Sequence, residues 1–289
     1  MVDEICSMKI SVITTCFNAE NTIQGCLESV GKQFYPDVEH FIVDAASTDG
    51  TLDILDEYQG SLAGVVSEPD TGIYDGMNKG LKLVTGDVVG ILNADDVFYS
   101  PDVLAKVAAV FEDQRIASCY GDLVYVAGSN DGSRLKVQSL GNSPPHPNPL
   151  PPGERGQGSD GFKVVRYWKA GEFDPRKFYW GWMPPHPTFF VRRSVYEKYG
   201  YFNLNMGTAA DYELMLRFLA KHRVSCAYLP EILVQMRTGG ASNVTLKRRL
   251  DANRMDRKAW EVNGLRPYPW TLLMKPIRKI GQWVSRPNF

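Results

Sequence analysis

An apolar run that stops at two adjacent carboxylates constrains the fold more than any other feature of this sequence. Residues 88–92 read Val-Val-Gly-Ile-Leu, and Asn93, Ala94, Asp95 and Asp96 follow directly. A short continuous apolar run is typical of a strand that is buried on both faces, as strands of parallel sheets are. Ligand crevices of open α/β sheets lie at the carboxyl ends of such strands. The sequence therefore predicts that Asp95 and Asp96 face a binding site.

Three earlier apolar stretches also have strand character, and each is followed by a helical pattern. We predict strands at 9–15, 40–44 and 63–67, and helices that begin near residue 22, at Thr51 and at Ile73. The alternation predicts a doubly wound α/β domain with a mostly parallel sheet. The second strand ends on Asp44, which we expect at the same sheet edge as the acid pair. Carboxylates crowded together repel one another, and a hard divalent cation that bridges phosphate oxygens would relieve this repulsion.

The second part of the chain is interrupted by a segment that cannot build a core. Residues 128–161 are rich in Gly, Ser, Pro and Asn and contain few apolar side chains. A tolerated surface insertion is one interpretation, and a ligand for a proline-binding module is the alternative. Around it we predict strands at 117–126, 162–168 and 227–234, and an amphipathic helix at 210–221 with Asp211 in its first turn.

The C-terminal segment is basic. After Thr245 the sequence has eleven Lys or Arg and three Asp or Glu, although the net charge of the whole chain is -1. Between Tyr268 and Trp283, apolar and aromatic residues alternate with Lys and Arg, which is the pattern of a segment that lies on an anionic membrane surface. A pair of solvated helices is the alternative. We expect no nucleic-acid partner.

Cysteine usage and the chain start bear on the compartment. The five cysteines are scattered and form no C-x-x-C pair, which favours reduced thiols over a disulfide framework or a zinc site. Residues 1–8 include Asp3 and Glu4 and have no basic stretch before a long apolar one, so we expect no signal peptide. No run of about 18 apolar residues predicts a membrane span. These features predict a cytoplasmic protein.

Taken in order, five motifs resemble those of the family 2 glycosyltransferases with the GT-A fold. They are 11–18 (SVITTCFN), 43–51 (VDAASTDGT), 68–80 (EPDTGIYDGMNKG), 93–96 (NADD) and 209–213 (AADYE). The resemblance covers roughly residues 8 to 243, apart from the proline-rich segment. The motif at 68–80 and the later 236–240 (MRTGG) are similar to the branch that serves bacterial exopolysaccharide synthesis, including the colanic acid type. Family members often carry Gly where Ala45 and Ala46 stand, and Glu where Ala210 stands.

This resemblance implies a fold and an activity. The fold is a GT-A, Rossmann-like α/β domain with a mixed, mostly parallel sheet flanked by helices. A donor half would span about 8–126, an acceptor half about 162–243 and a basic amphipathic tail 244–289. The activity is inverting, metal-dependent transfer of a hexose or N-acetylhexosamine from a nucleotide sugar, with UDP as the expected nucleotide. The acceptor would be polyprenyl-linked or a saccharide, at the inner face of the membrane.

The same resemblance implies roles for individual residues. Asp44 would contact the nucleobase or ribose, Asp95 would contact the ribose side, and Asp96 would hold Mg²⁺ or Mn²⁺ on the diphosphate. Asp211 would be the general base. The other expected donor-site residues are Thr15, Asp70, Tyr74, Asn78, Lys79, Asn93 and Arg237, and the expected acceptor-site residues are His186 and Trp182.

Structural roles remain open for several of these residues. The motif at 68–80 could form an exposed helix face, His186 could be a structural loop residue, and Trp182 could be a core side chain. Two other functions also remain open. A sugar nucleotidyltransferase would need a glycine-rich phosphate loop after the first strand, where this chain has Cys16-Phe17-Asn18-Ala19. The second open function is that of a catalytically silent scaffold that binds sugar nucleotides.

Overall fold

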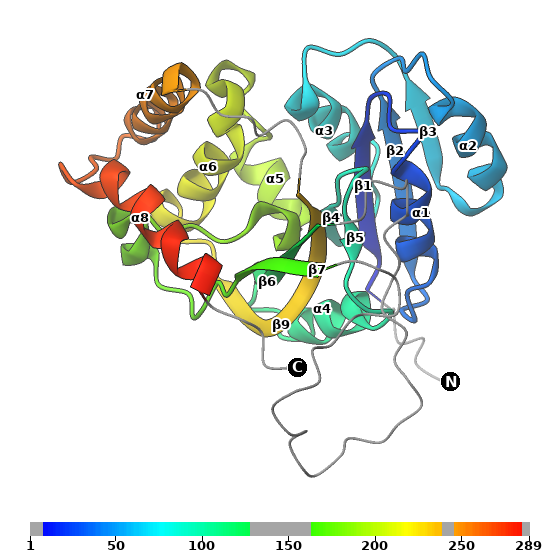
Figure 1. Cartoon of the computed structure of the whole chain (residues 1–289). Helices are drawn as coiled ribbons and strands as arrows, with labels where there is room; N and C mark the ends of the chain where they lie inside the picture. The colour runs from blue at the N-terminus through cyan, green and yellow to red at the C-terminus, as the bar shows by residue number, and fades with distance from the viewer. Residues whose placement is uncertain (1–7, 128–162, 239–245, 285–289) are drawn as a thin grey trace, which may run out of the picture.

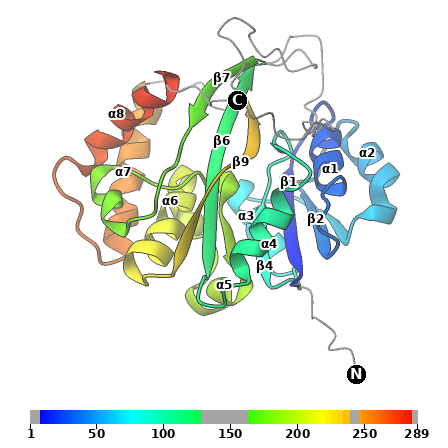
Figure 2. The ribbon, with the colours of Figure 1, turned by 90° about the horizontal axis from the view of Figure 1, so that it is seen from below.

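The computed structural model describes residues 8–127, 163–238 and 246–284. Nine strands of this described part form one sheet with the order β3-β2-β1-β4-β8-β6-β9-β5, and β7 pairs with the far end of β6. Helices lie on both sides of the sheet (Figures 1 and 2). The predicted α/β architecture with a mixed, mostly parallel sheet is therefore confirmed.

The N-terminal half alternates strands and helices as predicted. Its elements are β1 (Ile10–Cys16), α1 (Ile23–Gly31), β2 (Val38–Asp44), α2 (Thr51–Tyr58), η1 (Gln59–Ser61), β3 (Gly64–Ser67), α3 (Ile73–Leu81) and β4 (Val88–Ile91). Strand β1 runs parallel to β2 and β4, with Cys16 opposite Asp44 and Ile13 opposite Ile91. The carboxyl ends of these strands therefore meet at one edge, where the sequence places its acids.

The central strands β1 and β4 are buried on both of their faces. Ile13 of β1 belongs to a core cluster with Met77 of α3, whereas Val12 belongs to another cluster with Cys26 of α1. Neighbouring residues of a strand point to opposite faces, so a strand between two helical layers has no polar side. This explains the continuous apolar run at 88–92.

Strand β8 joins the two halves of the sheet. It is antiparallel to both β4 and β6. The approach is close, since a Cβ atom added to Gly90 would lie 2.3 Å from the ring of Phe190.

The elements of this second half are β5 (Val97–Phe98), α4 (Val103–Phe111), β6 (Ser118–Ala127), β7 (Lys163–Trp168), η2 (Pro175–Trp180), η3 (His186–Thr188), β8 (Phe190–Arg192), α5 (Arg193–Tyr199), η4 (Leu204–Ala209), α6 (Ala210–Met215), the π-helical η5 (Leu216–Lys221) and β9 (Cys226–Arg237).

The proline-rich segment lies outside the described residues. Its two flanks, however, are neighbours: β6 and β7 pair antiparallel, and Ala127 lies opposite Lys163. The chain thus leaves and re-enters the sheet at one end of a strand pair.

The two C-terminal helices, α7 (Leu246–Val262) and α8 (Thr271–Val284), pack against the second half. Trp260 of α7 is fully buried, and its Nε1 donates to the Tyr212 hydroxyl at 2.9 Å. On α8, Thr271 Oγ1 donates to the Tyr179 carbonyl at 2.7 Å, and Lys275 Nζ lies 3.5 Å from the centre of the Tyr212 ring. Ala259, Trp260 and Leu272 of this C-terminal segment therefore belong to the core of the second half, and both helices lie beside that half (Figure 1). None of the described helices has the length and apolar character needed to cross a membrane.

Candidate active site

The acid pair lies at the carboxyl end of β4, and its two members differ in environment. Asp96 is fully buried, whereas Asp95 is half-buried. The Asn93 amide donates to Asp96 Oδ2 at 2.9 Å, and the Asp96 backbone N–H donates to the Asn93 carbonyl at 3.0 Å. Burial and the adjacent charge of Asp95 raise the pKa of Asp96 well above its ordinary value. The position therefore favours a positive ligand that would offset the buried negative charge.

Several buried oxygen atoms at this edge are unsatisfied. Within the described residues, Thr15 Oγ1, Asn93 Oδ1 and Asp96 Oδ1 are buried and have no hydrogen-bond partner. A buried oxygen atom without a partner costs desolvation free energy unless a ligand donates a hydrogen bond to it or an ion is coordinated by it. The part of the chain that the structure covers contains no group of three His, Cys, Asp or Glu side chains placed to hold a metal. The donor set fits a cation that takes most of its ligands from a bound diphosphate, as Mg²⁺ commonly does.

Arg237 approaches the same acids from β9. Strand β5 pairs antiparallel with β9, with Val97 opposite Gln235, so two residues further along Arg237 lies near Asp95. Burial lowers the pKa of the Arg237 guanidinium, and the charge of Asp95 opposes that effect. The site thus has both carboxylates and a guanidinium at one edge, as the sequence predicted.

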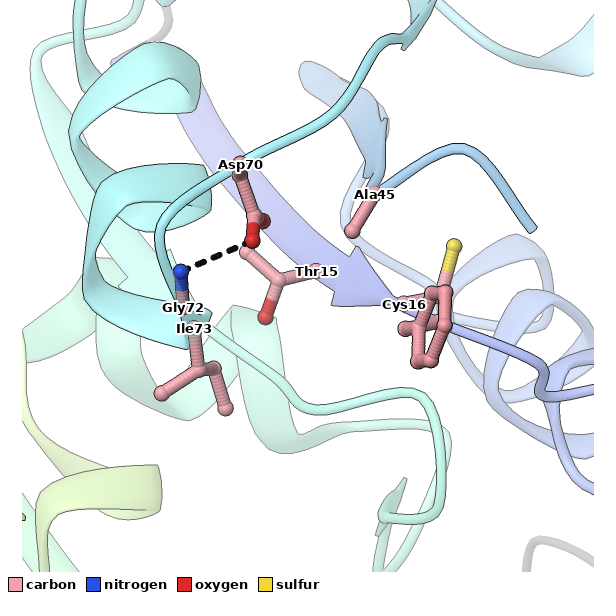
Figure 3. A pocket seen from close by; sticks show the side chains of 7 residues that line it. Thr15, Cys16, Ala45, Asp70, Gly72 and Ile73 are labelled. Carbon is pink, nitrogen blue, oxygen red and sulfur yellow. Dashed lines mark hydrogen bonds between the residues drawn. The ribbon is translucent and has the colours of Figure 1, made fainter.

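A pocket of about 450 Å³ opens beside the end of β1. Figure 3 shows Asp70 and Thr15 pointing into it, with Ala45 on the opposite side. Phe17 and Ile73 contribute exposed apolar surface, with 62% and 47% of their areas exposed. The residues that line it are Thr15, Cys16, Phe17, Ala45, Asp70, Gly72 and Ile73.

Asp44 does not reach this pocket, because its carboxylate is buried and used internally. It accepts hydrogen bonds from the Ser47 backbone N–H at 2.9 Å and from Ser67 Oγ at 2.6 Å, and it also bonds the Ser47 hydroxyl and the Cys16 thiol. Burial alone would raise the pKa of Asp44, but these hydrogen bonds outweigh it and lower the pKa. The carboxylate of Asp44 thus has its hydrogen-bond partners within the fold, and its expected contact with a nucleobase remains a prediction.

Asp70 is the carboxylate that does line the pocket. Its Oδ1 accepts the Gly72 backbone N–H at 2.8 Å, which orients the side chain at the start of α3. Lys79, on the same helix, donates to the Pro69 carbonyl at 2.9 Å and forms an ion pair with Glu68 at 2.9 Å. Lys79 thus holds the loop that carries Asp70.

A second cluster forms where α3 meets the second half of the chain. The negative charge of Asp211, in the first turn of α6, adds to burial in raising the pKa of Tyr74. His186 of η3 is half-buried; burial lowers its pKa and the charge of Asp211 opposes this. The structure therefore brings Tyr74 close to His186 and Asp211, which lie more than one hundred residues after it in the sequence.

Phe202 organises this cluster, although nothing in the sequence pattern singled it out. Its ring centre lies 5.4 Å from that of Tyr74 and 5.6 Å from that of His186. Asn78 exchanges two hydrogen bonds of 2.9 Å with the Phe202 backbone. The Asn78 amide is thus engaged by the protein itself, and its expected donor contact remains a prediction.

Trp182 lies in the core rather than at the surface. Only 6% of it is exposed, its Nε1 donates to the Ala170 carbonyl at 2.9 Å, and its ring makes edge contacts with Tyr120 and Phe178. This packing supports the structural interpretation of Trp182 and gives no support to contact with an acceptor.

The fold and the site define a GT-A-type glycosyltransferase: a doubly wound sheet with paired carboxylates and a pocket at the carboxyl ends of its parallel strands. The chain belongs to glycosyl transferase family 2, whose family model matches residues 11–200. This membership sets aside the nucleotidyltransferase alternative.

Related proteins agree with this class. The chain is 27% identical over 238 residues to a PGL/p-HBAD biosynthesis glycosyltransferase of Mycobacterium tuberculosis, covering 81% of this chain and 78% of the relative. It is 30% identical over 211 residues to an uncharacterized glycosyltransferase of the same species, covering 72% of this chain and 68% of the relative.

Two solved structures share the fold. TarS of S. aureus aligns with a TM-score of 0.60 at 18% identity, covering 96% of this chain but only 44% of the TarS chain. The mannosyltransferase PcManGT of Pyrobaculum calidifontis, in complex with GDP-Man and Mn²⁺, aligns with a TM-score of 0.59 at 17% identity, covering 97% of this chain and 76% of its own. A shorter TarS chain, residues 1–349, was solved with UDP-GlcNAc.

Proposed function

We propose that this glycosyltransferase moves a sugar from a nucleoside diphosphate, with UDP as the expected carrier, in a metal-dependent reaction that inverts the anomeric carbon. One observation carries the proposal: fully buried Asp96, with Oδ1 unpartnered within the described residues, lies beside Asp95 and near Arg237. A cationic group and paired acids at one strand end suit a diphosphate together with its counter-ion.

Asp96 would hold the cation, and Asn93 and Asp95 lie close enough in sequence to complete the same edge. When bound, Mg²⁺ or Mn²⁺ would stabilise the charge of the leaving nucleoside diphosphate. Arg237 would add a fixed positive charge on the β9 side, where its guanidinium can face phosphate oxygens.

We propose that Asp70 and Thr15 contact the nucleoside in place of Asp44. Asp70 presents a carboxylate that can accept a base N–H, and the buried Thr15 hydroxyl can pair with a neighbouring polar atom. The exposed ring of Phe17 offers an apolar surface for the flat face of a base. The internal hydrogen bonds of Asp44 support this reassignment.

Asp211 would be the general base that removes the proton from the attacking acceptor hydroxyl. It lies on α6 in the second half, near His186 of the same half and near Tyr74 of α3 across the boundary between the two halves. An acceptor oxygen is a weak nucleophile until its proton is removed, so a carboxylate at this place would raise the rate of attack. Attack from the side opposite the leaving group inverts the anomeric carbon.

The acceptor would be a polyprenyl-linked intermediate or a saccharide of a bacterial cell-surface polysaccharide. The exopolysaccharide-type motif at 68–80 supports this class. We propose that the protein acts at the inner face of the membrane, in peripheral contact with anionic lipid, which the basic C-terminal segment supports.

A panel of nucleotide sugars tests the function directly. Purified protein is mixed with UDP-, GDP- and dTDP-sugars, with Mn²⁺ or with EDTA, and release of the nucleoside diphosphate is measured alongside thermal protection. The proposal expects protection and slow hydrolysis for one nucleotide class, lost in EDTA. Protection without turnover, even with saccharide acceptors, would instead favour the silent scaffold.

A further inference from the structure

Five exposed apolar side chains lie on or beside helix α8. Trp180, Tyr268, Trp270, Leu273 and Ile277 expose between 42% and 63% of their areas. The Trp270 ring centre lies 5.9 Å from that of Trp180 and 5.1 Å from that of Tyr268. Leu273 and Ile277 follow Trp270 at helical spacing of three and four residues along α8. We call this surface the apolar face.

The apolar face is held in place by the opposite side of α8. Thr271 and Leu272 are buried, and Lys275 forms an ion pair of 2.7 Å with Asp256 of α7. Gly181 lies so close to α8 that an added Cβ would be 2.5 Å from the Lys275 backbone nitrogen. A helix of a water-soluble protein normally turns its polar side outward. Here α8 directs Leu273 and Ile277 outward instead.

The charge of the surrounding segment indicates what could cover this face. Residues 262–289 contain five basic residues, Arg266, Lys275, Arg278, Lys279 and Arg286, and no Asp or Glu. Arg266 and Arg278 are exposed. Aromatic and aliphatic side chains beside cations, without acids, complement a bilayer of anionic lipid, in which Trp and Tyr rings favour the headgroup region.

We propose that the apolar face inserts into the surface of an anionic bilayer. This inference rests on the proposed function, which places the protein at a membrane. It adds that the contact is made by a preformed surface, which includes Trp180 although that residue lies about ninety residues before Trp270 in sequence. In this proposal the protein binds the membrane by inserting apolar side chains, and not only by attraction between its basic residues and anionic headgroups. Insertion that depends on apolar burial persists at salt concentrations that screen surface charges.

Docking through this face would fix the orientation of the catalytic half. Lys275 of α8 rests on the ring of Tyr212, the residue after Asp211. Trp260 of α7 binds the hydroxyl of the same tyrosine. The apolar face and the helix that carries Asp211 are thus packed together, so docking through this face would fix the orientation of Asp211 relative to the bilayer. An acceptor carried by a membrane-embedded lipid fits this arrangement.

Sedimentation with vesicles tests the proposal. The full chain is mixed with vesicles of phosphatidylglycerol and phosphatidylcholine, or of phosphatidylcholine alone, at low and at high salt. We expect binding to the anionic vesicles that survives in part at high salt. The double variant Leu273→Ser/Ile277→Ser should bind roughly tenfold more weakly or worse, since it removes the two most exposed aliphatic chains of the face.

A matched control is available on the other half. Phe34→Ser/Leu83→Ser removes exposed apolar side chains, 68% and 37% exposed, that lie away from α8. It should bind vesicles as the unchanged protein does. Leu273→Trp should strengthen binding, which loss of folding could not produce.

The outcomes that overturn the proposal are distinct. They are absence of vesicle binding by the unchanged protein, or equal binding by the Leu273→Ser/Ile277→Ser variant. If sedimentation velocity shows that this variant dissociates a dimer of the unchanged protein, the face is an interface between chains and the proposal is wrong. Nucleotide-sugar protection, measured without vesicles, decides the proposed function separately.

Discussion

At the scale of single residues, the acids of this site differ in whether the protein itself already supplies their hydrogen-bond partners. The sequence placed Asp44, Asp95 and Asp96 correctly at one sheet edge, because strand ends can be located from apolar runs. The sequence could not show that Ser47 and Ser67 donate hydrogen bonds to the Asp44 carboxylate, because these partners come from a turn and from another strand. Phe202 was missed for the same reason: its contacts with Tyr74 and His186 are purely tertiary.

The division between Asp70 and Asp44 predicts opposite phenotypes. Asp70→Asn should weaken UDP binding roughly ten- to a hundredfold without changing stability, because one of the two acceptor oxygens becomes an N–H₂ donor and the negative charge is lost. Asp44→Asn should lower the free energy of unfolding by about 2 kcal/mol, because Ser47 and Ser67 lose a charged partner. Calorimetric titration with UDP and with inorganic diphosphate, together with urea unfolding, measures both effects. Asp56→Asn, an exposed acid on α2, is the control. Weaker UDP binding by Asp44→Asn at unchanged stability would refute the division.

Asp211→Asn tests the general base. We expect the rate of sugar transfer or donor hydrolysis to fall by about 10²- to 10⁴-fold, while the affinity for the nucleotide sugar stays the same, because the carboxylate acts on the acceptor proton. Single-turnover rates and thermal protection by the donor separate the two quantities. An unchanged rate would remove Asp211 from this role.

The lowered pKa of Glu39 predicts how the free energy of unfolding changes at acid pH. The Glu39 side chain is buried at the amino edge of the sheet, and it accepts hydrogen bonds from Ser11 Oγ, the Thr85 backbone and hydroxyl, and the Gly86 backbone. Burial would raise its pKa, but these bonds dominate and lower it from 4.5 to about 2. The charged form is therefore the stabilising one: about 3 kcal/mol of stability is present above pH 4.5 and is lost as the pH falls towards 2.

Replacing Glu39 by Gln should flatten this acid dependence. Urea unfolding between pH 3 and pH 7 would show a smaller loss of stability for Glu39→Gln than for the unchanged protein. Parallel curves for the two proteins would show that other carboxylates set the acid limit.

At the scale of elements, long periodic segments were predictable and short ones were not. Helices α2 and α3 begin at the predicted residues, Thr51 and Ile73, and strands β1 and β2 match their predicted spans within two residues at each end. Strands β5 and β8 were missed, because two or three residues carry no periodicity and these strands exist only through partners far away in sequence. The basic segment was predicted as helical, but its packing on Tyr179 and Tyr212 could not be read from its amphipathic pattern.

The packing of α8 predicts that it cannot be removed without loss of stability. Ending the chain before Thr271 would expose the cavity filled by Thr271 and Leu272 and would leave Asp256 without Lys275. We expect the truncated protein to be less stable by at least about 3 kcal/mol. Thermal and urea unfolding of the two chains measure this. Equal stability would show instead that the segment is a separate tail.

At the scale of the whole molecule, the sheet tolerates an insertion at one defined place. Ala127 and Lys163 lie opposite each other in the β6–β7 pair, so a tight turn can join them. Replacing residues 128–162 by Asn-Gly should leave the free energy of unfolding within about 1 kcal/mol of that of the full chain. Nucleotide protection should also be unchanged. A large loss of stability would mean that the segment contributes to the core.

The strand order has a further consequence for the order in which the protein is made. Strands β3, β2, β1 and β4 find their parallel partners within residues 10–91, whereas β6 needs β8 and also β9, which ends at Arg237. During synthesis, the four-strand block can thus form while most of the chain is still to be translated. The second half must wait for its last strand. The topology therefore allows the first half of the sheet to form before the half that carries Asp211.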